Sequence, residues 1–199
     1  MNTLVVSTIT SIDEANRQDP TDFDGQPLAL IQGQAASRWL DELCTTPSAE
    51  LRLAVRAHHL RRWEIARSDY PSGRAGYLRW RRENKAHQAT SLGDLMADDG
   101  WSDSSIAYAK LLLGRTQLRS HAETQALEDA ACLVFLETQF DAMAERTPGD
   151  RLVGIVTKTL KKMSPSAVTL ASAIGLSTTA QAVLANAAAM LGTEDSDDE

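Results

Sequence analysis

The chain has 199 residues, of which 43% are hydrophobic and 24% are charged, a composition typical of a globular protein rather than a disordered or fibrous one. Its net charge of -7 at pH 7 disfavours binding to long nucleic acids, which usually requires a broad basic surface. No apolar run approaches a membrane span, and the start, MNTLVVSTIT, lacks the basic segment and cleavage site of a signal peptide. We therefore expect a cytoplasmic protein with no membrane partner.

The sequence pattern of the first half of the chain predicts helices that are separated by turn-rich loops. Ser11 and Glu14 have capping-box spacing in SIDEANRQ, and the dipeptide Asp19-Pro20 ends that segment. The stretch TSLGD, residues 90–94, predicts a break before a short helix through Met96. Apolar residues recur with helical spacing in four further segments, residues 30–44, 48–65, 74–89 and 105–113.

The second half of the chain is also helical in pattern. The longest predicted helix covers residues 123–146, and its nearly apolar centre is typical of a buried helix. An amphipathic helix follows at 150–164, and two short Ala-rich helices follow in 165–191 around Gly175. No segment has convincing strand periodicity. The sequence thus predicts an all-α, single-domain bundle of about eight helices over residues 1–191, with a disordered acidic tail at 192–199.

The central helix carries two carboxylates among apolar residues. Asp129 opens the stripe that continues with Cys132 and Leu133, and Glu128 precedes it. A buried carboxylate needs a partner, because an unpaired buried charge is costly. Either an arginine in a structural ion pair or a metal ion bound by histidines of neighbouring helices could serve.

Histidines on two other predicted helices could complete such a metal site. His59, or its neighbour His58, and His87 would supply imidazole ligands, and Asp129 would supply an oxygen ligand. This ligand set suits a divalent ion such as Mn, Fe, Zn or Mg. The alternative is that these are ordinary core or surface histidines. Cys44 and Cys132 lie in helical patterns and predict neither a disulfide framework nor a thiolate zinc site.

Positive charge gathers between Arg52 and Lys85, where ten Arg and Lys residues face only three acids. This local excess would attract a small anionic ligand, although a solvated basic helix face is the alternative. Guanidinium groups bind phosphate in a bidentate manner, and adjacent aromatic rings could stack on a base or sugar. Alternatively, the aromatic rings pack within the protein and the arginines cover them through cation–π contacts. The predicted phosphate contacts are Arg61, Arg62, Arg74 and Arg81, and the predicted stacking residues are Tyr77 and Trp80.

Several of these motifs resemble a known family. The stretch RAHHLRRWEIARSDYPSGRAGYLRWR, followed by His87 and by LEDAACLVFLE at 127–137, resembles an uncharacterised helical family catalogued as domain of unknown function 4202. The similarity extends from SIDEANRQDP to KKMS. Members are sometimes labelled glutamyl-tRNA synthetase, but the chain has none of the nucleotide-binding signatures of such an enzyme.

A looser resemblance is to the HD-domain superfamily of all-helical, metal-dependent phosphohydrolases. Their ligand order is His, then His-Asp, then Asp, and His59, His87 and Asp129 would fill it here. The chain departs from this pattern at Gln88, which follows His87 where the superfamily has an aspartate. Glu64, Glu128 or Asp69 could take the place of that aspartate. The resemblance implies an HD-like fold.

These patterns lead to two principal functional hypotheses. The first is a metal-dependent phosphohydrolase acting on a nucleotide or other small phosphorylated compound, in which Glu128, or Glu64, positions or deprotonates the attacking water. The second is a non-catalytic module that binds a phosphate-bearing ligand or, less favoured, tRNA. A third, iron oxygenase chemistry, is disfavoured because dinuclear sites need more histidines than the four present, of which His121 lies in a predicted loop.

Overall fold

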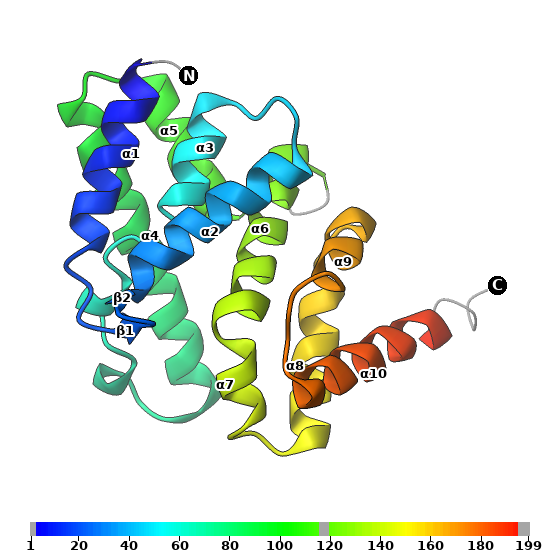
Figure 1. Cartoon of the computed structure of the whole chain (residues 1–199). Coiled ribbons are helices and arrows are strands. Elements are labelled where there is room, and N and C mark those ends of the chain that lie inside the picture. The colour runs from blue at the N-terminus through cyan, green and yellow to red at the C-terminus, as the bar shows by residue number, and fades with distance from the viewer. Residues whose placement is uncertain (1–2, 116–119, 195–199) are drawn as a thin grey trace. The chain divides into compact units, whose positions relative to one another are not determined.

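The computed structural model describes residues 3–115 and 120–194, which form an all-α fold with one short β-hairpin (Figure 1). This confirms the predicted all-α class, whereas the HD-like fold stays a prediction. The chain divides into two compact units, Met1–Leu127 and Glu128–Glu199, and the boundary falls within helix α6. No helix of the described ranges is long and apolar enough to cross a membrane.

The first unit contains the elements up to the start of α6. Its helices enclose a core of fully buried side chains that includes Ile12, Leu53, Leu92 and Leu112. The elements are α1 (Thr3–Asn16), β1 (Asp22–Phe23), β2 (Gln26–Pro27), α2 (Leu28–Leu43), α3 (Ala49–Arg56), the short 3-10 helices η1 (Arg62–Glu64) and η2 (Arg67–Asp69), α4 (Gly73–Asp98), α5 (Asp103–Gly114) and the start of α6 (Ala122–Thr138).

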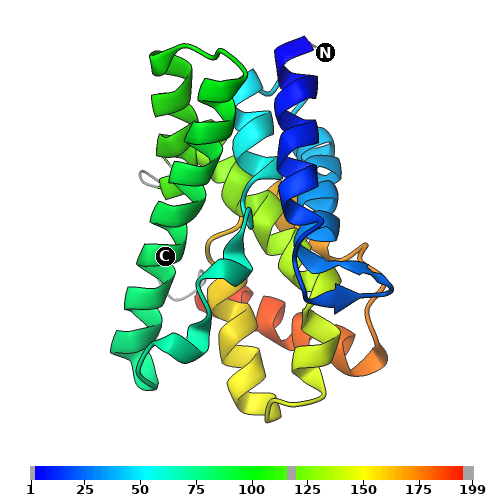
Figure 2. The same cartoon turned by 90° about the vertical axis from the view of Figure 1, so that its left-hand side faces the viewer.

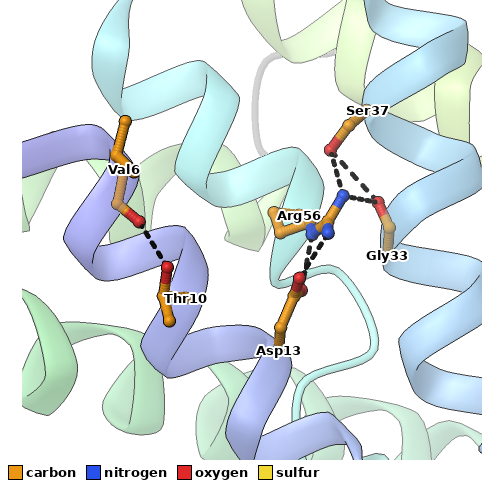
Figure 3. A network of polar contacts seen from close by, with 6 residues as sticks. All are labelled: Val6, Thr10, Asp13, Gly33, Ser37 and Arg56. Atoms are coloured by element: carbon orange, nitrogen blue, oxygen red, sulfur yellow. Dashed lines mark hydrogen bonds and ion pairs between the residues drawn. The ribbon is translucent and has the colours of Figure 1, made fainter. Parts of the chain in front are cut away.

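Helices α1, α2 and α3 are joined by the side chain of Arg56, the last residue of α3. Figure 3 shows its guanidinium between Asp13 of α1 and both Gly33 and Ser37 of α2. Because one side chain binds groups on two other helices, it fixes the end of α3 relative to both of them.

Helices α4 and α5 lie side by side in antiparallel directions (Figure 2). The predicted break at residues 90–94 is wrong, because α4 continues through them to Asp98. Ser91, Leu92 and Gly93 are buried, and Gly93 packs closely against the side chains of Lys110 and Ile106 of α5. The small residues that predicted a break therefore allow close packing between the two helices.

Three other boundaries differ from the sequence-based expectation. Helix α1 begins at Thr3, since Val5 and Thr8, ahead of the predicted start at Ser11, form one buried stripe with Ile12. The predicted helix over 123–146 is interrupted at Gln139, where the backbone leaves helical geometry (φ −131°, ψ −18°) and the buried Phe140 begins α7.

The third difference is that α3 ends at Arg56, so the predicted helix over 48–65 is wrong beyond that point. Residues 57–61 form turns in which the amides of His58 and Leu60 donate to the third preceding carbonyls, those of Val55 and Ala57. This arrangement buries both His58 and Leu60, and tertiary burial thus overrides the local helical pattern.

The segment between the first two predicted helices, residues 19–29, contains the hairpin of β1 and β2. Asp24 and Gly25 form its two-residue turn, both with positive φ, which is the usual signature of an Asp-Gly hairpin. The strands are only two residues long, so the hairpin does not change the fold class.

The second unit contains most of α6, with α7 (Phe140–Ala144), α8 (Gly149–Leu160), α9 (Pro165–Ala171) and α10 (Thr178–Glu194). Leu152, Val156 and Leu160 form the buried stripe of α8, as its amphipathic pattern predicts, and α10 packs against α8. The two predicted helices on either side of Gly175 are present as α9 and α10, although α10, with 17 residues, is not short. Because α10 runs to Glu194, the start of the predicted tail is helical, and residues 195–199 lie outside the described ranges.

Candidate functional site

A small basic pocket lies in the first unit, between the turn after α3, η1, α4 and the end of α5. Its volume is about 70 Å³, which is enough for a few water molecules or one tetrahedral anion. None of the described residues that line it is acidic. They are His58, His59, Arg62, Arg81, Asn84, Lys85, Gln88, Leu113 and Arg115.

The two histidines occupy the turn that follows α3. Their rings are stacked with centroids 4.1 Å apart. His58 Nδ1 lies 3.0 Å from the carbonyl oxygen of Val55, and His59 Nδ1 contacts Oε1 of Gln32 in α2. Burial lowers the pKa of His58 to about 3, with a further contribution from the positive charge of Arg115. Burial and then His58 lower the pKa of His59 well below its usual value, so both rings are neutral at pH 7.

Cationic side chains concentrate around the histidines. The guanidinium of Arg62 lies 4.6 Å from the ring centroid of Trp80, and that of Arg81 lies 5.7 Å from the ring centroid of Tyr77. Burial lowers the pKa of Arg62; Tyr77 opposes this, and the charges of Arg115 and Arg81 add to it. Within the described ranges neither Arg62 nor Arg81 forms a salt bridge with a carboxylate. The positive charges of Arg62 and Arg81 at the pocket are therefore not neutralised by a salt bridge to a carboxylate of the described residues.

Two buried amides on α4 complete the wall of the pocket. Asn84 and Gln88 are one helical turn apart and are only 1% and 4% exposed. Asn84 Nδ2 donates to the carbonyl oxygen of Ile65 at 3.3 Å, and Trp80 Nε1 donates to the same oxygen at 2.9 Å. Asn84 Oδ1, Gln88 Nε2 and His58 Nε2 are buried without a hydrogen-bond partner in the described part of the chain. Folded proteins seldom leave such atoms unsatisfied, so a bound water or ligand is expected there.

The structure brings together only part of the predicted site. His59, Arg62 and Arg81 line the pocket. The other two predicted phosphate contacts, Arg61 and Arg74, are not among the lining residues. Nε of Arg61 lies 3.9 Å from Oε1 of Glu64, and Arg74 is exposed in the first turn of α4.

The predicted stacking residues also lie outside the pocket lining. Tyr77 is 44% exposed, whereas Trp80 is buried with its ring facing Arg62. Both rings carry arginines in the cation–π arrangement that the sequence left as the alternative.

The predicted metal ligand His87 and the predicted catalytic acid Glu64 form a separate pair. His87 Nε2 lies 2.9 Å from Glu64 Oε2, and both side chains are partly exposed. His87 is not among the residues that line the pocket.

The carboxylates of α6 have partners within the second unit. Asp129 Oδ1 accepts a hydrogen bond of 2.9 Å from the backbone amide of Ser164, and Glu128 Oε1 lies 3.8 Å from Lys162 Nζ. In residues 3–115 and 120–194 no group of three or more His, Cys, Asp and Glu side chains is arranged to hold a metal ion. The metal site of His59, His87 and Asp129 stays a prediction.

Sequence reasoning missed Lys85, Gln88 and Arg115 as pocket residues and did not choose between the two histidines. One signal was available for α4: residues 80, 84 and 88 form a stripe of Trp, Asn and Gln, whose polar groups would be unusual on a purely structural buried face. Nothing local marks Arg115, which reaches the pocket because it follows α5 in a left-handed conformation (φ 50°).

The sequence profile of a family described as Domain of unknown function (DUF4202) matches residues 6–184. No curated protein and no solved structure matches the chain.

Proposed function

The chain belongs to this DUF4202 family, and we propose that it binds a small phosphate-bearing molecule with the phosphate in the basic pocket. The observation that carries the proposal is the composition of the pocket wall. Its wall contains the basic side chains of Arg62, Arg81, Lys85 and Arg115, and no acidic side chain belongs to the part of the wall that the structure describes. Such a cluster of cations without an acid in the wall favours an anion.

The chemistry of the wall favours phosphate over a carboxylate ligand. A phosphate offers several oxygens in a tetrahedral arrangement, which suits cations approaching from η1, α4 and the end of α5. Arginine forks bind such oxygens in pairs, and buried amide groups add directed hydrogen bonds. The volume of about 70 Å³ admits the phosphate group alone, so the rest of the ligand would extend outside.

The metal-dependent phosphohydrolase activity predicted from the sequence stays a prediction. Phosphate binding is the step that a hydrolase and a binding module would share, so the pocket supports this shared step. The chemical step would need the predicted ligands His59, His87 and Asp129, or others, to bind a metal.

Calorimetric titration with inorganic phosphate at low ionic strength tests the proposal. We expect saturable binding that weakens roughly tenfold or more in Arg81→Gln, since a hydrogen bond to a charged group contributes about 1.5–3 kcal/mol. The matched control is Arg74→Gln, because Arg74 is on the same helix but exposed and outside the pocket. Absence of saturable binding by the wild type, or equal weakening in both variants, would overturn the proposal.

A further inference from the structure

Two of the unsatisfied atoms in the pocket are hydrogen-bond acceptors, and geometry determines this for each. The Val55 carbonyl can only accept, so His58 Nδ1, 3.0 Å away, must carry the ring proton. A neutral imidazole has a single N–H group, and Nε2 of His58 therefore presents a lone pair.

The same reasoning orients Asn84. The carbonyl of Ile65 can only accept, so the atom 3.3 Å from it must be the amide nitrogen of Asn84. The neighbouring Trp80 Nε1, which donates to the same oxygen, holds that carbonyl in place. Oδ1 of Asn84 is thereby left as a buried acceptor without a partner among the described residues.

A ligand that satisfies the hydrogen-bonding groups of this pocket must both accept and donate hydrogen bonds. It must present anionic oxygens to Arg62 and Arg81, and it must also present a donor to Nε2 of His58 or Oδ1 of Asn84. A fully deprotonated anion such as sulfate has only lone pairs, so it would leave the two acceptors unsatisfied or face them directly. An oxyanion that carries a hydroxyl group can present its oxygens to the cations and donate its proton to one of the acceptors.

We propose that the pocket selects a protonated oxyanion, namely hydrogen phosphate or a phosphate monoester that retains one proton, and rejects sulfate. This inference rests on the proposed function, because it specifies the form of the anion that enters the same pocket. The proton of the ligand would point to His58 Nε2 or Asn84 Oδ1, and the remaining oxygens would face the cations.

The experiment compares titrations with inorganic phosphate and sodium sulfate at pH 7 and equal ionic strength. We expect phosphate to bind at least about tenfold more tightly, as expected when sulfate leaves a buried acceptor unpaired. If neither anion binds, the proposed function fails. If both bind equally, the proposed function survives and this inference fails, which would mean that water satisfies the acceptors.

Two variants test the acceptors separately. His58→Asn can still donate to Val55 through its amide but lacks the ring Nε2, and Asn84→Ala removes the other acceptor. Each should reduce the preference for phosphate by weakening phosphate binding more than sulfate binding. An unchanged preference in both variants would overturn the inference.

A measurement of the His58 tautomer keeps the inference falsifiable if a variant fails to fold. Nitrogen–proton correlation spectra of wild-type protein labelled in histidine should show the proton on Nδ1. A proton on Nε2 would make that atom a donor and would overturn the inference.

Discussion

Arg56 and Asp13 form a two-point salt bridge between α3 and α1. Nε of Arg56 lies 2.7 Å from Oδ1 of Asp13, and Nη2 lies 2.5 Å from Oδ2. The side chains are only 11% and 14% exposed. Nη1 of the same guanidinium donates to Ser37 Oγ at 3.2 Å. Removal of one partner would therefore leave the other charge largely desolvated.

Asp13→Asn should lower the free energy of unfolding by about 3 kcal/mol, since breaking a buried ion pair on one side leaves the remaining charge uncompensated. Urea denaturation followed by circular dichroism measures this change. The control is Asp41→Asn, which breaks the more exposed pair of Arg52 and Asp41, whose side chains are 31% and 60% exposed. That variant should lose less than about 1 kcal/mol. Equal losses in the two variants would contradict the structural role of Arg56.

The buried His58 makes stability depend on pH. Its pKa is about 3 in the folded protein, against an ordinary value of 6.5, so between these values only the unfolded chain binds the proton. Stability from this group is complete above the unfolded pKa and falls as the pH drops below it. From pH 7.5 to 5.5 the loss amounts to about 1.4 kcal/mol, and His59, whose pKa is also lowered, adds to it in the same direction.

His58→Asn isolates this contribution, because asparagine can still donate to Val55 and does not titrate. Urea denaturation at the two pH values should show a loss of stability about 1.4 kcal/mol smaller in the variant than in the wild type. The same pH dependence in both proteins would mean that His58 is charged in the folded state.

Two glycines in α4 should differ in how strongly alanine destabilises the protein. A Cβ on Gly76 would lie 2.0 Å from the carbonyl oxygen of Pro71, and this backbone atom cannot move alone. Gly76→Ala should therefore cost about 1–3 kcal/mol or more. A Cβ on Gly93 would meet the end of the Lys110 side chain, which is flexible and can move, and would lie 3.4 Å from a side-chain carbon of Ile106. Alanine also adds about 1 kcal/mol of helix propensity. Thermal unfolding should thus show a lowered Tm for Gly76→Ala and little change for Gly93→Ala.

Local pattern was sufficient for most helices. Stripes such as Leu152, Val156 and Leu160 have a period that only a helix places on one face. Ser102, a residue type that favours helix starts, caps α5 by accepting from the amide of Ser105. The end of α3 could not be predicted in this way. It depends on the burial of His58 and Leu60, and on contacts made by residues distant in the sequence.

The sequence predicted the charge of the ligand of the candidate site but not the full set of residues that line it. The excess of arginine pointed to an anion, and His59, Arg62 and Arg81 do line the pocket. Gln88 entered the sequence reasoning only as a departure from the HD pattern, yet its side chain is buried in the wall of the pocket. Which member of a basic segment faces a pocket depends on tertiary packing, and no spacing rule reports it.

Asp129 allows its structural role and its predicted role as a metal ligand to be separated. Its Oδ1 accepts from the amide of Ser164, the residue whose own hydroxyl caps α9 by accepting from Ala167. Asp129→Ala should lower the free energy of unfolding by about 1–3 kcal/mol, because the partly buried amide of Ser164 loses its acceptor, and Asp129→Asn should lose less, since it retains an oxygen.

The predicted metal site adds a different expectation for protein purified without chelator or affinity tag. Mass spectrometry should find a divalent ion in the wild type and much less in Asp129→Asn and His59→Ala. Unchanged metal content in a folded Asp129→Asn would leave Asp129 as the acceptor for Ser164 and would rule it out as a ligand.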